Sequence, residues 1–541
     1  MNIRSELRAD PTGVFVHDLV LEACRRFSAR TLLVDTSYSV PRRITYAEYG
    51  SLVESAARGL VAAGLRPGER VGIYLSNSWE YCVGYHATTL AGGIPTPLNP
   101  SYREREVRYQ FENSGAVLLI TDGPLISGMN LAGLPELRRI YATRDASATG
   151  AGMFSDLLRL REAALPQVDQ ASDQTLAALP YSSGTTGLPK GVMLTHHNLV
   201  ANVYQLLGPG CSSLADGEVI LCFLPLYHIY GLNVVLNPSF TLGATLVLMP
   251  RFEVTRVLQL VREEGVTFIP AVPAVLNAFC LAAEQGLFPR EHRLHFVKSG
   301  AAPLAADLGR RFISLTGVPV VQGYGMTEAS PVTHIGVAEN CMEMVGSIGL
   351  AVAQTDCRLI AENGAECGDG EPGELVMRGP QFMSGYWRAP EASAEVLRPL
   401  PSSIAAEGRL LPNDGTWYWS GDVAWRDKQG LYYIIDRRKE MIKYKSFSVA
   451  PAEIEAVLLE HPAVRDCGVV GRADSAAGEI PCAFIVLRDG FASGAPIETE
   501  LCGYVSERLT SYKQPREVRF VDAIPRNPSG KILRRMLRET L

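Results

Sequence analysis

Short apolar runs alternate with helical patterns along much of the chain, and this alternation limits the folds that the chain can adopt. Thr45 and Glu48 form a capping box before an apolar helical pattern that stops at Gly64, and a strand pattern follows at 71–75. Further buried-strand candidates lie at 116–121, 294–299 and 318–322. Strands that alternate with helices pack in layers, so the pattern predicts an α/β fold class.

The 541 residues exceed the size at which one hydrophobic core stops growing, so we expect at least two domains. Strand patterns bounded by glycine dominate 346–433, and the charged segment DRRKEMIKYK follows at 436–445. Beyond it, Pro451 opens a short helical pattern at 452–460, and two strands and another helix follow. The tail of about a hundred residues is therefore predicted to form a small α+β domain.

Composition and charge exclude several classes of partner and site. With 47% hydrophobic residues and a net charge of −6, the chain has an ordinary globular composition and lacks the basic field that nucleic acids require. The eleven cysteines include no C-x-x-C pair and no Cys/His cluster at zinc spacing, which argues against a disulfide framework or a structural metal. The charged N-terminus lacks a signal-peptide core, and no apolar stretch reaches the length of a membrane span. We therefore expect a soluble, cytoplasmic protein without an integral membrane span.

A loop rich in Ser, Thr and Gly, YSSGTTGLPKG, starts at Tyr181. Glycines let backbone N–H groups face an anion, and the hydroxyls and a lysine add donors and charge, so the loop is a candidate phosphate site. Pro189 stands where a Walker loop has its second glycine, and the following GVMLT reads as a strand, so a P-loop NTPase is disfavoured. Considered alone, the loop could also be a flexible surface linker. The candidate phosphate contacts are Ser182, Ser183, Thr185, Thr186 and Lys190.

Seven motifs resemble, in order, the core motifs of the adenylate-forming superfamily: YSSGTTGLPKG, LPLYHIYGL, GYGMTEASP, PGELVMRGP, YWSGDVAW, DRRKEMIKYK and NPSGKILRR. The chain is most similar to acyl-CoA synthetases of the 4-coumarate:CoA ligase and fatty acyl group, which firefly luciferase also resembles. The resemblance implies a large N-terminal domain, 1–436, of two α/β-layered sheets and a distorted β-barrel, and a small mobile α+β domain, 437–541. It places a hinge at about 436–439, at Lys439, about which the small domain rotates between two half-reactions.

The resemblance also implies which residues contact the nucleotide. Attack of a carboxylate on the α-phosphate of ATP brings two anions together, and Lys531 is implied to supply positive charge at that point. Asp422 is implied to accept hydrogen bonds from the ribose hydroxyls, with Arg437 supporting the nucleotide. Adenine stacking, an α-phosphate contact and a Mg²⁺ ligand are implied for Tyr324, Thr327 and Glu328 respectively. Without the motifs, Lys531 would be interpreted as a solvated lysine and Asp422 as an ordinary turn residue.

His228, in the motif LYHIYG, is implied to lie beside the acyl carboxylate and the thiol tunnel, although a lone buried histidine is more often structural. The positions that line the acyl pocket in relatives are occupied here by Tyr230, Val234, Lys298, Gly300 and Gly325. Several of these are small, which indicates a roomy pocket, while core packing explains the apolar ones equally well. His196 and His197 are adjacent and diverge in direction, so a helix start is favoured over a metal pair.

The hinge segment departs from the family pattern at two positions. Relatives read K-Y-K-G-F-Q-V-A-P, whereas this chain reads KYKSFSVAP from Lys443, which is itself a catalytic candidate. Ser446 replaces a glycine beside the pantetheine tunnel, where a Cβ at positive φ would cost about 1–2 kcal/mol. Ser448 replaces a glutamine whose reach a hydroxyl cannot match. We hypothesise that these changes weaken or abolish thioester formation, while neutral drift on a solvated loop is the alternative.

The sequence thus predicts activation of a carboxylic acid to acyl-AMP with release of pyrophosphate. The expected cofactors are ATP and Mg²⁺, and the expected acceptor is CoA or a partner protein that completes thioesterification. A complete acyl-CoA ligase, a luciferase-like oxygenase and a binding module without catalysis are the alternatives, and Lys531 argues against the last. Aryl, fatty and terpenoid acids all fit the motifs. The segment 388–419 is longer than usual and is expected to be a surface loop.

Overall fold

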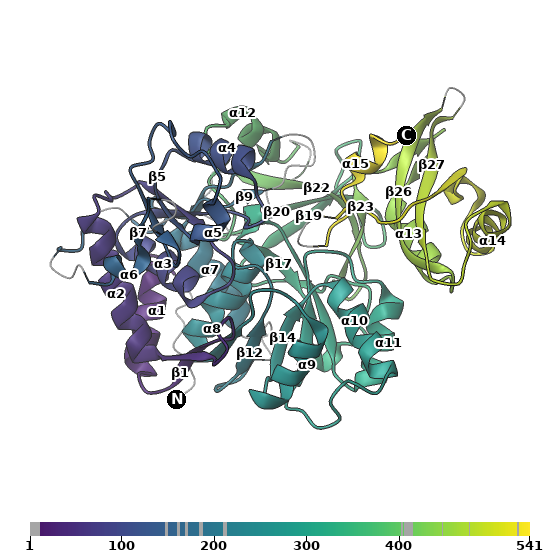
Figure 1. Cartoon of the computed structure of the whole chain (residues 1–541). Coiled ribbons are helices and arrows are strands. Elements are labelled where there is room, and N and C mark those ends of the chain that lie inside the picture. The colour runs from purple at the N-terminus through teal and green to yellow at the C-terminus, as the bar shows by residue number, and fades with distance from the viewer. Residues whose placement is uncertain are drawn as a thin grey trace.

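The chain folds into a large body and a smaller one that carries the C-terminus (Figure 1). The computed structural model describes residues 11–146, 150–159, 163–167, 171–182, 188–208, 214–401, 404, 415–445, 447–474, 477–526 and 530–541, with only the backbone of residue 448. The architecture is mixed α/β, with a large N-terminal part and a small C-terminal part, as predicted.

A nine-stranded sheet forms the centre of the large body. Its strands, in spatial order, are β18 (Leu350–Ala351), β17 (Val332–Ile335), β16 (Val320–Gly325), β15 (Phe296–Ser299), β14 (Phe268–Ala271), β12 (Val219–Cys222), β13 (Thr245–Leu248), β1 (Thr31–Asp35) and β2 (Arg42–Thr45). The strands from β16 to β1 run parallel, and β2, β17 and β18 add antiparallel edges. The carboxyl ends of the parallel strands therefore meet along one edge, where open α/β sheets bind ligands.

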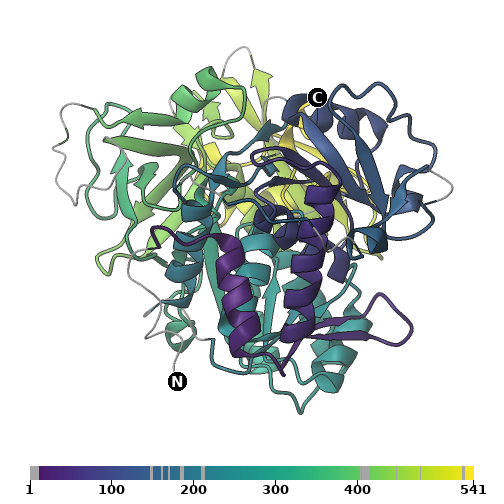
Figure 2. The same cartoon turned by 90° about the vertical axis from the view of Figure 1, so that its left-hand side faces the viewer.

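Helices cover this sheet and complete its core. They are α1 (Val16–Arg26), α7 (His196–Leu207), α8 (Asn237–Leu242), α9 (Val254–Glu263), α10 (Pro273–Glu284) and α11 (Ala306–Thr316), with a π-helical turn at Gly231–Leu236. Figure 2 shows α1 beside α2 (Tyr46–Ala62) in front of the sheet. The capping box predicted at Thr45 and Glu48 is present at the start of α2, with both reciprocal hydrogen bonds made.

A second sheet, all parallel, lies at the N-terminal side. Its order is β4 (Ile94–Pro97), β3 (Arg70–Tyr74), β5 (Ala116–Thr121), β6 (Arg139–Ala142) and β7 (Gly152–Met153). The helices on this side are α3 (Trp79–Leu90), α4 (Glu104–Ser114), α5 (Gly123–Ile126) and α6 (Phe154–Leu157). Two short pairs join the sheets: β8 (Leu176–Ala178) with β11 (Leu194–Thr195), and β9 (Tyr181–Ser182) with β10 (Lys190–Gly191).

A third sheet, antiparallel, is formed by residues between 356 and 437. It contains β19 (Asp356–Ile360), β20 (Gly373–Arg378), β22 (Thr416–Arg426), β21 (Leu397–Pro399) and β23 (Tyr432–Arg437). The expectation of a plain surface loop at 388–419 is wrong in part, because the helix α12 (Pro390–Val396) and β21 lie within it. Pro390 at the first helical position supplies the fixed φ that starts this helix.

The small body is built on a fourth sheet. Its strands are β25 (Phe447–Val449), β24 (Ile442–Tyr444), β27 (Gly478–Leu487), β26 (Val464–Asp474) and β28 (Glu517–Phe520), with α13 (Pro451–Leu459), α14 (Ala495–Ser506) and α15 (Arg534–Arg538). The chain leaves the third sheet at Arg437 and enters this one at Ile442, after a turn that contains Lys439. The domain boundary at 436 and the hinge at Lys439 remain predictions.

The apolar clusters of the described residues divide between the two bodies. Those of the large body draw on residues between Val14 and Ile434, and those of the small body on residues between Ile442 and Leu537. Each of the described clusters is therefore confined to one side of the 438–441 turn. Among the described residues, we find no helix with the length and apolar character of a membrane span.

Candidate active site

Several of the predicted site residues lie at the carboxyl edge of the central sheet. Tyr324 and Gly325 end β16, and Thr327 begins the short 3₁₀ turn Thr327–Ala329 that follows. Gly300 follows the last residue of β15, and His228 lies six residues after the end of β12. The parallel topology thus brings together residues from widely separated motifs.

A buried carboxylate, Asp422, connects the third sheet to this edge. Tyr324 Oη donates a hydrogen bond to Asp422 Oδ2, and Arg437 Nε lies 3.2 Å from Asp422 Oδ1. The register of β22 and β23 pairs Asp422 directly with Arg437, so the sheet itself fixes this ion pair. Desolvation and the neighbouring Asp422 charge raise the pKa of Tyr324 well above its ordinary value, which keeps the phenol protonated as a donor.

Lys531, in the small body, lies within range of the same two charges. Desolvation and the positive charge of Arg437 lower the pKa of Lys531 to about 8, while the Asp422 charge opposes this shift. A charge effect of this kind requires proximity, so the ammonium group lies close to both Asp422 and Arg437. The small body therefore brings Lys531 within electrostatic range of Asp422 and Arg437.

Glu328 and Lys190 form a second part of the site. The side chain of Glu328 is buried, and its Oε1 accepts a hydrogen bond of 2.8 Å from Tyr386 Oη. The Lys190 ammonium lies 5.2 Å from the centre of the Tyr386 ring. Ser182 pairs with Lys190 across β9 and β10, whereas Ser183, Thr185 and Thr186 lie outside the described residues.

Two of the predicted acyl-pocket residues, Lys298 and Gly300, contact a third, Tyr230. Tyr230 Oη donates to the carbonyl oxygen of Lys298 at 3.0 Å, and a Cβ added to Gly300 would lie 3.0 Å from the Tyr230 ring. Val234 lies on the π-helical turn after Tyr230, and a Cβ at Gly325 would meet the Pro331 carbonyl oxygen at 2.0 Å, so Gly325 must be glycine. The fold therefore brings Tyr230, Lys298 and Gly300 together.

His228 is neutral in this environment. Desolvation lowers the pKa of His228 to about 4, and its Nδ1 accepts a hydrogen bond of 3.2 Å from the backbone N–H of Tyr230. This bond fixes the tautomer with the proton on Nε2. His196, by contrast, is the first residue of α7 and its Nδ1 accepts from the backbone of Val16, as expected for a helix start.

The hinge-proximal candidates are only partly described. Lys443 lies on β24, and its Nζ is 3.4 Å from Glu362 of the large body. Ser446 lies outside the described residues, as does the side chain of Ser448, whose backbone pairs with Lys443.

Sequence reasoning missed three residues that structure the site, namely Tyr386, Asp436 and Arg534. Asp436 and Arg534 lie inside the quoted motifs DRRKEMIKYK and NPSGKILRR, and Tyr386 follows PGELVMRGP. Their position in or near the motifs was the only signal in the sequence. Their contacts could not be predicted from it, because the residues that they contact are distant in sequence.

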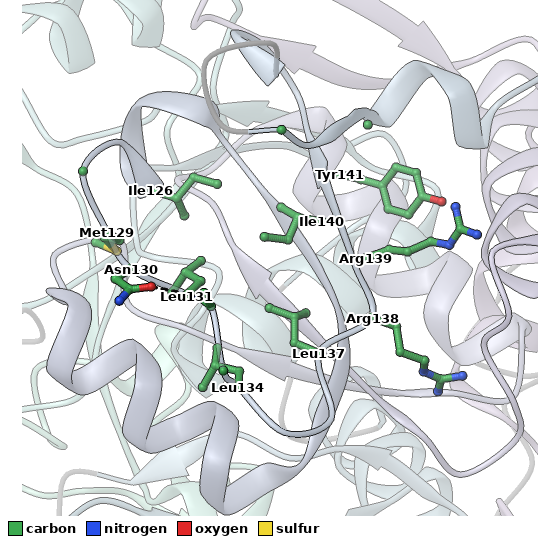
Figure 3. A pocket seen from close by; sticks show the side chains of 15 residues that line it. Ile126, Met129, Asn130, Leu131, Leu134, Leu137, Arg138, Arg139, Ile140 and Tyr141 are labelled. Carbon is green, nitrogen blue, oxygen red and sulfur yellow. Dashed lines mark hydrogen bonds between the residues drawn. The ribbon is translucent and has the colours of Figure 1, made fainter.

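A separate cavity of about 690 Å³ lies under the connection between α5 and β6 (Figure 3). Figure 3 shows the side chains of Ile126, Leu131 and Leu137, which line this cavity. None of the site residues above lines it.

Comparison with known families identifies the chain. Residues 20–387 match the family described as AMP-binding enzyme, and residues 453–531 match the AMP-binding enzyme C-terminal domain. The chain belongs to the AMP-binding enzyme family. The predicted membership of the adenylate-forming superfamily is confirmed, and with it the general activity, which is formation of an acyl-adenylate from a carboxylic acid and ATP.

Named relatives in this family are similar over nearly their whole length. The 4-coumarate-CoA ligase 1 of Narcissus pseudonarcissus is 37% identical over 98% of this chain and 94% of its own. ATP-bound MatB from Rhodopseudomonas palustris superposes with a TM-score of 0.83 at 27% identity, over 97% of this chain and 98% of its own. O-succinylbenzoate Coenzyme A synthetase from Bacillus subtilis, in complex with AMP, gives 0.79 at 29% identity, over 96% and 98%. AMP-binding enzymes with ATP or AMP bound thus share the fold of this chain.

Proposed function

We propose that this chain activates an aromatic carboxylic acid with ATP and Mg²⁺ and then transfers the acyl group from AMP to CoA. The observation that carries the proposal is the position of Lys531, whose ammonium group lies near both Asp422 and Arg437. Attack on the α-phosphate brings two anions together, so a preorganised positive charge at this point favours the transition state. The relatives are named as ligases of 4-coumarate and benzoate, which supports an aromatic acid.

The ribose and adenine occupy the side of the site formed by Tyr324, Asp422 and Arg437. A carboxylate has four acceptor positions, so Asp422 accepts from ribose hydroxyls in addition to Tyr324. The Arg437 guanidinium forms an ion pair with this carboxylate, with its Nε 3.2 Å from Asp422 Oδ1. The Tyr324 ring provides the face on which adenine stacks.

The triphosphate lies along the loop that ends at Lys190. The donors we assign to it are Ser182, Ser183, Thr185, Thr186, Lys190 and Thr327. Mg²⁺ is held in proteins by one or two carboxylates together with substrate phosphates, and the buried carboxylate of Glu328 fits this pattern. The ion would neutralise charge on the phosphates.

The acid binds between Tyr230, Val234, Lys298, Gly300 and Gly325. Gly300 lies against the ring of Tyr230, and any larger residue there would press on the ring. His228 lies next to this region. Because it is neutral, it can donate a hydrogen bond from Nε2 to the acyl group, while the positive charge in the site comes from Lys531.

CoA is the acceptor that we propose for the second step. The named relatives are CoA ligases, and none of their names indicates a partner protein. Rotation about Lys439 would withdraw Lys531 and bring Lys443 to the site. Ser446 and Ser448 then slow this step relative to adenylation, as the sequence predicts.

Pyrophosphate exchange that depends on the acid tests the proposal. Lys531→Ala should lower exchange by about 10²–10³-fold, since a preorganised charge is removed. Lys428→Ala, an exposed lysine in the turn between β22 and β23, is the matched control and should exchange at the rate of the unaltered enzyme. An unchanged rate in Lys531→Ala would contradict the catalytic role. A panel of aryl and fatty acids, with CoA thioester measured in parallel, tests the substrate class and the acceptor.

A further inference from the structure

The segment from Met383 to Trp387 joins two parts of the site that are far apart in sequence. The backbone N–H of Met193 donates to the Gly385 carbonyl at 3.0 Å, and that of Trp387 donates to the Gly191 carbonyl at 2.8 Å. At its other end, the backbone N–H of Met383 donates to the Glu328 carbonyl at 2.8 Å. The segment is therefore fixed both to the strand that follows the phosphate loop and to the turn that carries Glu328.

The side chain of Tyr386 repeats this connection. Its hydroxyl donates a 2.8 Å hydrogen bond to Glu328 Oε1, and its ring lies 5.2 Å from the Lys190 ammonium. Tyr386 is only 8% exposed, and its backbone N–H donates to Ser393 Oγ at 2.8 Å, so the ring has little freedom to move. Desolvation and the Glu328 charge raise the pKa of Tyr386, and the hydroxyl remains a donor.

This hydrogen bond constrains the orientation of the Glu328 carboxylate. Oε1 accepts from Tyr386, and within the described ranges no hydrogen bond or ion pair reaches Oε2. Carboxylates that bind metals are commonly oriented by such hydrogen bonds from residues that do not touch the metal. One oxygen of Glu328 is thus held by the hydroxyl of Tyr386.

We propose that Tyr386 is a positioning residue that orients Glu328 for Mg²⁺ and, through its ring, holds Lys190 for the phosphates of the same nucleotide. The inference rests on the proposed function, in which Glu328 binds the metal. Tyr386 touches neither metal nor nucleotide itself. Its role is to fix the positions of the Glu328 carboxylate and the Lys190 ammonium relative to each other, so that the metal ion and the lysine contact the same triphosphate.

Tyr386→Phe separates the two roles, because it removes the hydroxyl and keeps the ring. Binding of Mn²⁺ is measured by electron paramagnetic resonance in the presence of α,β-methylene-ATP, which the enzyme cannot cleave. We expect about 10- to 100-fold weaker Mn²⁺ binding in Tyr386→Phe, the usual cost of losing such a partner of a metal ligand. Binding of the same analogue in EDTA should be unchanged, which also shows that the variant is folded. Unchanged Mn²⁺ affinity would overturn the proposal.

Tyr433→Phe provides the matched control. Tyr433 Oη donates to Asp427 Oδ2 at 3.1 Å, so this variant loses the same type of phenol-to-carboxylate bond outside the site. Its Mn²⁺ affinity should equal that of the unaltered enzyme, and a loss like that of Tyr386→Phe would contradict a local effect. Tyr386→Leu also removes the ring, and should weaken metal-free analogue binding by about two- to fivefold through the lost cation–π contact with Lys190.

Glu328→Gln distinguishes failure of this inference from failure of the proposed function. If Glu328→Gln loses Mn²⁺ binding and Tyr386→Phe does not, Glu328 is the ligand and the positioning role of Tyr386 is wrong. If Glu328→Gln binds Mn²⁺ as tightly as the unaltered enzyme, the metal role of Glu328 is wrong, and the inference falls with it. Weakened binding in both variants supports the inference.

Discussion

Asp436 Oδ2 accepts a 3.0 Å hydrogen bond from the backbone N–H of Ala452, so a residue of β23 in the large body caps the first turn of α13 in the small body. The other oxygen of Asp436 lies 3.6 Å from Arg534 Nη1, and Arg534 also pairs with Glu455 at 2.8 Å. Arg534 is three residues from Lys531. One carboxylate therefore ties the large body to the segment that carries the catalytic candidate.

Replacing Asp436 should loosen Lys531. In Asp436→Ala the helix cap and the ion pair are both lost, and a lost cap alone costs about 1 kcal/mol, equivalent to about a fivefold lower exchange rate. Asp436→Asn keeps an oxygen that can accept from the Ala452 N–H, so its exchange rate should lie between those of the unaltered enzyme and Asp436→Ala. Pyrophosphate exchange at saturating acid is the measurement, and an Asn variant as slow as Ala would show that the cap contributes nothing.

Adenylation should decline at high pH as Lys531 loses its proton. Its pKa is lowered to about 8, so in the free enzyme the ammonium form predominates below that value and disappears as pH rises through it. Because the proposed role needs the charged form, kcat/KM for ATP in the exchange assay should fall above pH 8. Lys531→Arg keeps its charge throughout this range, and its lower activity should lack the alkaline decline. If kcat/KM of Lys531→Arg declined with the same midpoint, the alkaline decline would be due to a group other than Lys531.

Gly300→Ala should narrow the acyl pocket. The added Cβ would lie 3.0 Å from Cε1 of Tyr230, whose hydroxyl is held by the Lys298 carbonyl, so the ring cannot swing away without losing that bond. We expect KM for bulky acids to rise by about tenfold while KM for ATP stays the same, since overpacking costs about 1–3 kcal/mol. Gly503→Ala, on α14 with open space around it, is the control. Equal KM changes for small and bulky acids would contradict this placement.

Ser446→Gly should increase thioester formation. If relatives hold this position at positive φ, removing the Cβ recovers about 1–2 kcal/mol, or roughly tenfold in the balance between half-reactions. The ratio of acyl-CoA to acyl-AMP released per ATP consumed is the quantity to follow, with Ser448→Gln examined in parallel. The hypothesis is wrong if the ratio in both variants equals that of the unaltered enzyme, or if the unaltered enzyme already releases acyl-CoA as fast as it forms acyl-AMP.

Features that depend on neighbours in sequence were predictable. The capping box of Thr45 and Glu48 is local, and the strand at 116–121 is an uninterrupted apolar run that the structure reproduces. The strand predicted at 318–322 extends further, to Gly325, because β17 pairs with it and draws Tyr324 into the sheet. The sequence alone does not show that β17 pairs with this strand, so its extension to Gly325 could not be predicted.

Long-range polar contacts were not predictable from the residues themselves. Tyr386 donates to Glu328 and forms an isolated bridge with Val192, and no local sequence pattern encodes either contact. Asp436 caps a helix that starts only after an intervening hairpin. The family resemblance selected the residues that touch the nucleotide, whereas the residues that hold them in place required the fold.

The division of the apolar clusters at the 438–441 turn bears on how the two bodies can separate. The contacts described between them are polar: the Asp436–Arg534 pair, the Ala452 cap, and the Lys443–Glu362 pair. Water can take over such contacts at little net cost, whereas a shared apolar core would have to be exposed. The small body can therefore exchange one set of contact residues on the large body for another, as two proteins in a transient complex do. Each body keeps its own apolar interior while this happens.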